Sequence, residues 1–300
     1  MFKALKWIAL ICLVALVAGC GEKTETTKYF YSPTWARDGR ILMVGATQSV
    51  NKDNLGSQLS SSYSEYVFSI YPSGTGESSP LFNTTDNPPY AMTCSPATDY
   101  VAYGNDLMNN LYRTIVIQNI AIGQHSGIEK LELAFAGVQS FDWSNDGTKL
   151  VYCTSSEVRT VNINGSNDTL VTQETSVDFV TWKYGGRIAF VHTPGASKIL
   201  SLIYPDGSGR VDLAAASSVS LPQISAVNTN EVFGKVGDTY IKVNVNTGTT
   251  TPVVTLGFVG ELPRLSSTAK QLTYSKSGQS SGVYVLGDVS TATPSEKRLK

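Results

Sequence analysis

One sequence pattern recurs six times in this 300-residue chain and constrains its fold more than any other feature. Each copy has an apolar residue, a polar residue, a large apolar residue, serine or a substitute, a turn, and a short apolar strand. The clearest copy is Phe141-Asp-Trp-Ser-Asn-Asp-Gly-Thr-Lys-Leu-Val-Tyr. The large apolar position falls on Trp35, Cys94, Trp143, Trp182, Ile224 and Leu265, at intervals of 59, 49, 39, 42 and 41 residues. A unit of this size buries its apolar faces only against neighbouring units.

A second signature follows the first in most copies. A strand with alternating apolar residues, such as Val158-Arg-Thr-Val-Asn-Ile, runs into a turn with Asp, Asn or Gly, which is typical of a hairpin. Four strands in about 40–50 residues make one propeller blade, and six blades close into a ring without long exposed edges. We therefore predict an all-β fold, a six-bladed β-propeller of four-stranded antiparallel blades. The predicted blades span residues 29–83, 88–135, 137–172, 175–213, 218–255 and 258–299.

The turns of these repeats resemble those of the TolB-like, WD40-like propeller family. Trp143-Ser-Asn-Asp-Gly matches the family's turn between the first two strands of a blade, and Tyr204-Pro-Asp-Gly-Ser-Gly matches its turn between the last two. The second copy has Ser95-Pro96 without Asp-Gly, and the fifth and sixth keep only the serine. The resemblance covers residues 29–299 and implies a binding domain, because in TolB relatives the propeller binds a peptidoglycan-associated lipoprotein and other envelope partners. TolB itself has an additional N-terminal domain that this sequence does not show.

The first 20 residues are typical of a bacterial lipoprotein signal. The start is basic, residues 7–17 form an apolar run too short for an ordinary spanning helix, and Val17-Ala-Gly-Cys20 resembles a lipobox. We predict a signal peptide over residues 1–19, an acylated Cys20 with a short linker through residue 28, and the propeller over 29–300. Gly21, directly after the predicted acylated cysteine, favours a location in the outer membrane facing the periplasm. The inner membrane and the cell surface are the alternative locations. A linker of about eight residues spans under about 30 Å, which predicts a propeller close to the membrane.

Composition disfavours several classes of function. A net charge of −1 does not suit a nucleic-acid binder. The only histidines, His125 and His192, occupy different repeat positions, so we expect structural or solvent-facing roles rather than a triad or a metal site. No P-loop or Rossmann spacing occurs. We predict a monomeric, non-enzymatic protein without cofactor or metal that engages an envelope protein. The alternatives are an envelope glycan or peptide hydrolase or lyase, and a small-ligand receptor.

The repeat register predicts a polar ring around the central channel. The residue before each large apolar position is polar, although its neighbours are apolar. Because the innermost strand of each blade borders the channel, these side chains are candidates for lining it. They are Thr34, Thr93, Asp142, Thr181, Gln223 and Arg264. Asp142 and Arg264 lie three blades apart and hence on opposite sides. The ring could hold a small polar ligand or ion, or only ordered water.

Polar segments of the first two blades predict a second candidate surface. Residues 51–63 form an insertion between the second and third strands of blade 1, residues 105–110 take the equivalent place in blade 2, and residues 83–90 link the two blades. These segments should emerge on one face as irregular loops, where binding residues commonly lie; solvated, variable loops are the alternative. The candidate partner-binding residues are Asn51, Lys52, Asp53, Asn54, Asp86, Asn87, Tyr90, Asn105, Asp106 and Met108.

Two further residue types have structural interpretations. Cys94 and Cys153 lie in apolar strand patterns, so we expect buried free thiols, although the predicted compartment permits a disulfide. Trp35, Trp143 and Trp182 are expected to anchor neighbouring blades rather than to stack on a ligand.

Overall fold

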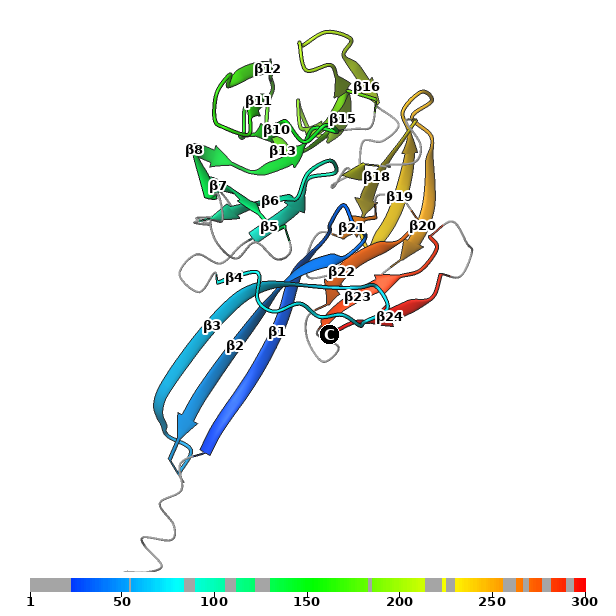
Figure 1. Ribbon diagram of the computed structural model, residues 1–300. Coiled ribbons are helices and arrows are strands. Elements are labelled where there is room, and N and C mark those ends of the chain that lie inside the picture. Colours follow the sequence, from blue (N-terminus) through cyan, green and yellow to red (C-terminus); the bar gives the residue numbers. More distant parts are fainter. Residues whose placement is uncertain are drawn as a thin grey trace, which may run out of the picture.

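The computed structural model shows six antiparallel four-stranded sheets arranged as the blades of a propeller (Figure 1). It describes residues 23–53, 55–83, 90–105, 112–121, 130–182, 185–213, 223–224, 230–255, 263–266, 270–276, 282–289 and 294–300. Within them lie 24 strands, and the members of each sheet are neighbours in sequence order. The predicted fold is confirmed, and each blade is one continuous segment. No described residues form a helix long and apolar enough to cross a bilayer.

The strands of the six blades have the following bounds. Blade 1 contains β1 (Lys23–Trp35), β2 (Ile41–Lys52), β3 (Gln58–Ile70) and β4 (Phe82–Asn83), and blade 2 contains β5 (Tyr90–Cys94), β6 (Tyr100–Asn105), β7 (Tyr112–Asn119) and β8 (Lys130–Val138). Blade 3 contains β9 (Ser140–Trp143), β10 (Lys149–Cys153), β11 (Glu157–Asn162) and β12 (Thr169–Gln173), and blade 4 contains β13 (Val177–Trp182), β14 (Ile188–His192), β15 (Ile199–Ile203) and β16 (Val211–Leu213). Blade 5 contains β17 (Gln223–Ile224), β18 (Glu231–Val236), β19 (Thr239–Asn244) and β20 (Thr250–Thr255), and blade 6 contains β21 (Arg264–Leu265), β22 (Leu272–Lys276), β23 (Gly282–Leu286) and β24 (Glu296–Arg298).

The core lies between blades, because both faces of the middle strands are apolar. One cluster joins Ile115 and Leu133 of blade 2 to Trp143 and Leu150 of blade 3. Burial of this kind stabilises each blade only when its neighbour is present. The blade is therefore not an independent folding unit, which explains why the repeats must close into a ring.

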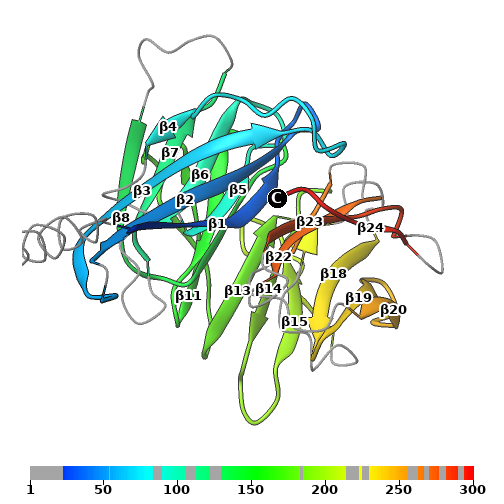
Figure 2. The same cartoon turned by 90° about the horizontal axis from the view of Figure 1, so that it is seen from below.

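Ring closure rests on the contact between blades 1 and 6 (Figure 2). Met43 and Phe68 of blade 1 pack in one apolar cluster with Val283 and Val285 of blade 6. The indole Nε1–H of Trp35 donates to the main-chain oxygen of Arg264 at 3.1 Å. The first and last blades are thus joined by side-chain packing and a hydrogen bond.

Blade 1 departs from the sequence prediction, because its first three strands extend beyond the propeller as an arm (Figure 1). We define the arm as residues 23–28, 47–52 and 58–64 with the turn over residues 53–57. Lys23 pairs with Lys52, and the β1–β2 register continues inward to Trp35 and Ile41. The predicted linker is therefore wrong for residues 23–28, which are strand. The predicted irregular loop over residues 51–63 is also wrong, because only residues 53–57 separate β2 from β3.

The antiparallel blades give the propeller two faces with different turns. The first strand of every blade ends, and its second strand begins, on one face, which we call the turn face; in blade 1, residues 36–40 form this turn. The next turn along the chain lies at the other end of the second strand and hence on the opposite face. The arm continues blade 1 in that direction, so we call this the arm face. The arm and the first turn of blade 1 therefore point in opposite directions.

Candidate functional site

The Trp-Ser-Asn-Asp-Gly motif builds a rigid turn on the turn face of blade 3. The Ser144 hydroxyl donates to Asp146 Oδ1 at 2.6 Å and accepts from the main-chain N–H of Lys149 at 3.0 Å. Gly147 has φ of 68°, a left-handed conformation that glycine adopts without strain. A Cβ on Gly147 would lie 2.4 Å from Ser95 Oγ of blade 2, so the turn also packs against its neighbour. The motif therefore has a structural role: it stabilises the end of β9.

Two tryptophans make the same hydrogen bond between neighbouring blades. Trp143 donates its indole N–H to the main-chain oxygen of Thr93 in blade 2 at 2.9 Å. Trp35 donates in the same way to Arg264 in blade 6. Each acceptor is the predicted ring residue of the preceding blade. These contacts support the interpretation of the tryptophans as anchors between blades.

Asp142 joins three consecutive blades through its carboxylate. Its Oδ1 accepts from the main-chain N–H of Trp143 at 2.9 Å and from the Thr93 hydroxyl at 3.3 Å. Its Oδ2 accepts from the Thr181 hydroxyl at 2.5 Å and from the main-chain N–H of Trp182 at 3.3 Å. Four donors from blades 2, 3 and 4 thus surround one carboxylate. Such charge-assisted hydrogen bonds are stronger than neutral ones.

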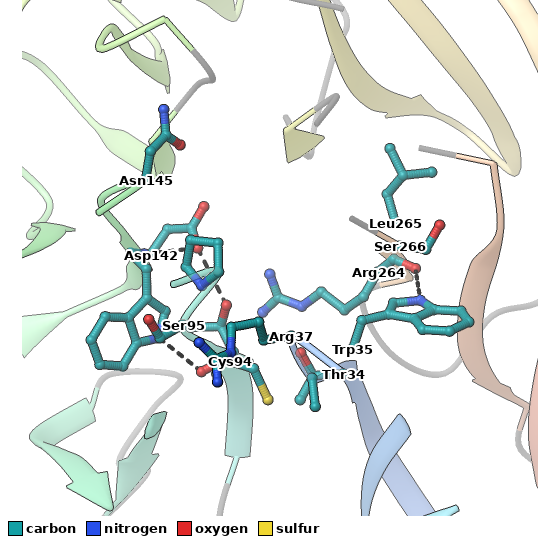
Figure 3. A pocket seen from close by; sticks show the side chains of 14 residues that line it. Thr34, Trp35, Arg37, Cys94, Ser95, Asp142, Asn145, Arg264, Leu265 and Ser266 are labelled. Carbon is teal, nitrogen blue, oxygen red and sulfur yellow. Dashed lines mark hydrogen bonds between the residues drawn. The ribbon is translucent and has the colours of Figure 1, made fainter. Parts of the chain in front are cut away.

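Four of the six predicted ring residues line one cavity of about 330 Å³ on the turn face, which we call the channel mouth (Figure 3). They are Thr34, Thr93, Asp142 and Arg264. Thr181 lies beside them through its hydrogen bond to Asp142. The side chain of Gln223 is outside the described residues. The structure thus brings these residues, which are far apart in sequence, into one cavity.

Arg264 places a positively charged side chain in the channel mouth. Its side chain extends from the blade 6 wall toward the wall that carries Asp142 (Figure 3). Among the described residues no carboxylate forms an ion pair with Arg264, and its guanidinium makes no hydrogen bond there. Arg37, the second cation of the lining, is bound to Asp99 at 3.3 Å. The Arg264 guanidinium is thus available for an incoming anion.

The described members of the predicted partner-binding set lie on the arm face, away from the channel mouth. Asn51 and Lys52 end β2, and Asp53 begins the turn at the tip of the arm. Asn105 ends β6 with its side chain buried, and Tyr90 begins β5. Asn54, Asp86, Asn87, Asp106 and Met108 are outside the described residues. A binding role for this set stays a prediction.

A buried polar network surrounds His192 between blades 3 and 4. His192 Nε2 lies 3.0 Å from Ser201 Oγ, and His192 Nδ1 lies 3.1 Å from Glu174 Oε2. The order serine, histidine, acid is that of a hydrolase triad. However, Ser201 is fully buried and donates its hydroxyl to Asp212 at 2.7 Å. The serine cannot reach a substrate in this arrangement, so the network ties two blades together. The predicted structural role fits His192, and His125 lies outside the described residues.

His192 predicts a pH dependence of stability. Burial lowers the pKa of His192, Arg210 lowers it further, and Glu174 and Asp212 act in the opposite direction. The unfolded chain therefore takes up this proton at higher pH than the folded chain. We expect the His192 contribution to the free energy of unfolding to fall as the pH decreases from about 7 to about 5. Urea unfolding across this range should show a flatter pH profile for His192→Gln than for the wild type.

Comparing His192→Gln with the wild type isolates the contribution of His192 to the pH dependence of stability. Burial raises the pKa of Glu65 to about 7, and this group acts with the opposite sign over the same range. The Glu65 effect is common to both proteins and cancels in their difference. Equal pH slopes for His192→Gln and the wild type would contradict the assignment.

The remaining residues singled out in the sequence have clear positions. Cys94 and Cys153 are free thiols, as predicted, although only Cys153 is fully buried and Cys94 is partly exposed. Among the described residues, no group of three or more His, Cys, Asp or Glu side chains is placed to hold a metal ion.

The fold is a six-bladed β-propeller with a polar cavity, the channel mouth, on its turn face. TolB from Acinetobacter baumannii matches with a TM-score of 0.57 and 11% identity, over 88% of this chain and 77% of that chain. The tricorn protease matches with a TM-score of 0.41 and 12% identity, over 83% of this chain and 29% of that chain. The β-propeller domain of Myceliophteria thermophila Cps50 (Swd1) matches with a TM-score of 0.45 and 14% identity, over 66% of this chain and 67% of that chain. No family model and no curated protein matches the chain.

Proposed function

We propose that the protein is a non-enzymatic binding propeller of the bacterial cell envelope, anchored through a lipid on Cys20, that engages a protein partner at the channel mouth. The lipobox residues that precede Cys20 support the anchor. The TolB-like fold supports a binding domain of the envelope. The channel mouth supplies a concave surface at the centre of the ring.

The guanidinium of Arg264, which pairs with no carboxylate of the described residues, is the observation that carries this proposal. Arginine recognises carboxylates through two parallel hydrogen bonds, and a partly enclosed cavity weakens competition from water. Asp142, on the opposite wall, already accepts four hydrogen bonds and is not free to pair with Arg264. The expected ligand is therefore an acidic side chain or a terminal carboxylate in an extended segment of the partner.

The lining of the channel mouth favours binding over acid–base catalysis. Its described residues include no histidine, and their one carboxylate, that of Asp142, is surrounded by donors. A general base must be within hydrogen-bond reach of the proton that it removes. Asp142 is instead occupied by groups of the propeller itself, which supports a structural role.

Charge reversal at Arg264 tests the proposed site. We expect Arg264→Glu to weaken binding of the partner, captured from envelope extracts with the wild-type chain, by at least about tenfold, which corresponds to about 1.4 kcal/mol. Lys149→Glu is the matched control, because Lys149 is exposed beside the turn of blade 3 and does not line the cavity. Affinity measured by titration of the purified partner gives the comparison.

The same experiment distinguishes a partner that binds the turn face from one that binds the arm face. A partner that binds Arg264→Glu as tightly as the wild type contradicts the channel-mouth assignment. If shortening the turn over residues 53–57 then abolishes binding, the partner occupies the arm face instead.

A further inference from the structure

The tip of the arm is apolar, whereas the strands behind it are mostly polar. Leu55 is 92% exposed and Leu59 is 54% exposed, the two highest values among the large exposed hydrophobic side chains of the described chain. The strands behind the tip consist largely of serine, threonine and other polar residues, such as Thr24–Thr27 and Ser60–Ser62. Exposed leucines gathered at one end of a polar element indicate a contact surface rather than scattered surface residues.

The turn at the tip holds Leu55 outward in a fixed conformation. Asp53 Oδ1 accepts from the main-chain N–H groups of Leu55 at 2.9 Å and Ser57 at 2.8 Å. Gly56 has φ of 85°, and its N–H donates to the main-chain oxygen of Asp53 at 3.0 Å. The turn is thus closed by its own hydrogen bonds. The exposed side chain of Leu55 takes no part in them.

The position where the preceding chain joins the arm indicates which surface covers the tip. β1 begins at Lys23, which pairs with Lys52 at the tip, so residues 1–22 connect to the molecule at this end. Cys20 is only three positions before Lys23, a distance of about 10 Å when fully extended. An acyl chain on Cys20 would therefore bring the lipid surface within reach of Leu55. Lys23 supplies positive charge at the same end, where lipid phosphates would lie, whereas Lys52 forms an ion pair with Glu25 at 2.5 Å.

We propose that the arm tip docks on the membrane surface, with Leu55 and Leu59 in the lipid interface and Lys23 toward the phosphates. The proposal rests on the proposed anchoring at Cys20. Because the arm and the channel mouth lie on opposite faces of the propeller, the docked arm holds the channel mouth away from the membrane. The arm thus replaces the expected short linker with a rigid support that presents Arg264 to a partner.

A fluorescent probe at the tip tests the docking. The full-length lipidated chain carrying Leu55→Cys is labelled with a nitrobenzoxadiazole dye and reconstituted on vesicles of phosphatidylethanolamine and phosphatidylglycerol. We expect the emission to shift to shorter wavelength on vesicles, because the dye enters the interface. Ser197→Cys is the matched control: Ser197 is exposed in the equivalent turn of blade 4, on the same face but without an arm, and its emission should not shift. Labelled wild type corrects for dye on the native thiols.

The outcomes distinguish the docking from the anchor on which it rests. Vesicles that retain the protein while the dye at position 55 stays water-like overturn the docking and leave the anchor intact. Protein that does not stay on vesicles overturns the anchor and the docking together. A second label at Leu59→Cys must shift as well, since both leucines belong to the proposed contact.

Discussion

Replacing Trp143 with alanine is expected to lower the free energy of unfolding by about 3–5 kcal/mol. The side chain is 1% exposed and packs in the cluster between blades 2 and 3, where its removal leaves a cavity. It also donates to the main-chain oxygen of Thr93, which would lose its partner. Urea unfolding measures the effect as a lower midpoint at an unchanged slope.

Two further variants separate packing from hydrogen bonding. Trp143→Phe keeps most of the apolar volume and removes the indole N–H, so we expect a loss of only about 1–2 kcal/mol. Trp35→Ala should cost less than Trp143→Ala, because Trp35 is only partly buried, although it makes the equivalent hydrogen bond. If Trp143→Ala changes stability by less than about 1 kcal/mol, the tryptophan does not anchor the two blades.

The repeat made the ring predictable from sequence, because buried strands leave periodic apolar residues and turns leave Asp, Asn and Gly. The same register placed Thr34, Thr93, Asp142 and Arg264 together, since equivalent positions of a closed ring face one channel. The sequence did not predict that four donors hold Asp142. Nor did it predict that Arg264 has no anionic partner among the described residues. These contacts depend on the relative placement of blades, which no local pattern records.

The arm was not predictable for a different reason. Its strands lie outside the core and have largely polar side chains on both faces, so the apolar alternation that indicates a strand is missing. They form because each continues a buried strand of blade 1 and pairs with its neighbour, as with Thr27 and Gln48. The network at His192 was missed in a similar way. Pairing of β14 with β15 places Ser201 beside His192, although their types and spacing match no motif.

Replacing Asp142 with alanine is expected to lower the free energy of unfolding by about 2–4 kcal/mol. The substitution leaves the hydroxyls of Thr93 and Thr181 and the main-chain N–H groups of Trp143 and Trp182 without their acceptor. Because these donors belong to three blades, the loss should also loosen the contacts between blades. Urea unfolding measures the stability change, and hydrogen exchange of the Trp182 amide reports the local effect.

Two control variants test whether the loss comes from bridging between blades. Asp146→Asn also alters an aspartate that accepts hydrogen bonds, but its acceptor contacts stay within one turn, so we expect a smaller loss. Thr181→Val removes one donor to Asp142 at nearly constant shape and should cost about 1 kcal/mol. If Asp142→Ala is as stable as the wild type, the carboxylate does not hold the blades together. Asp142 would then be free to act on a ligand in the channel mouth, and the case against an enzymatic role would lose its main structural support.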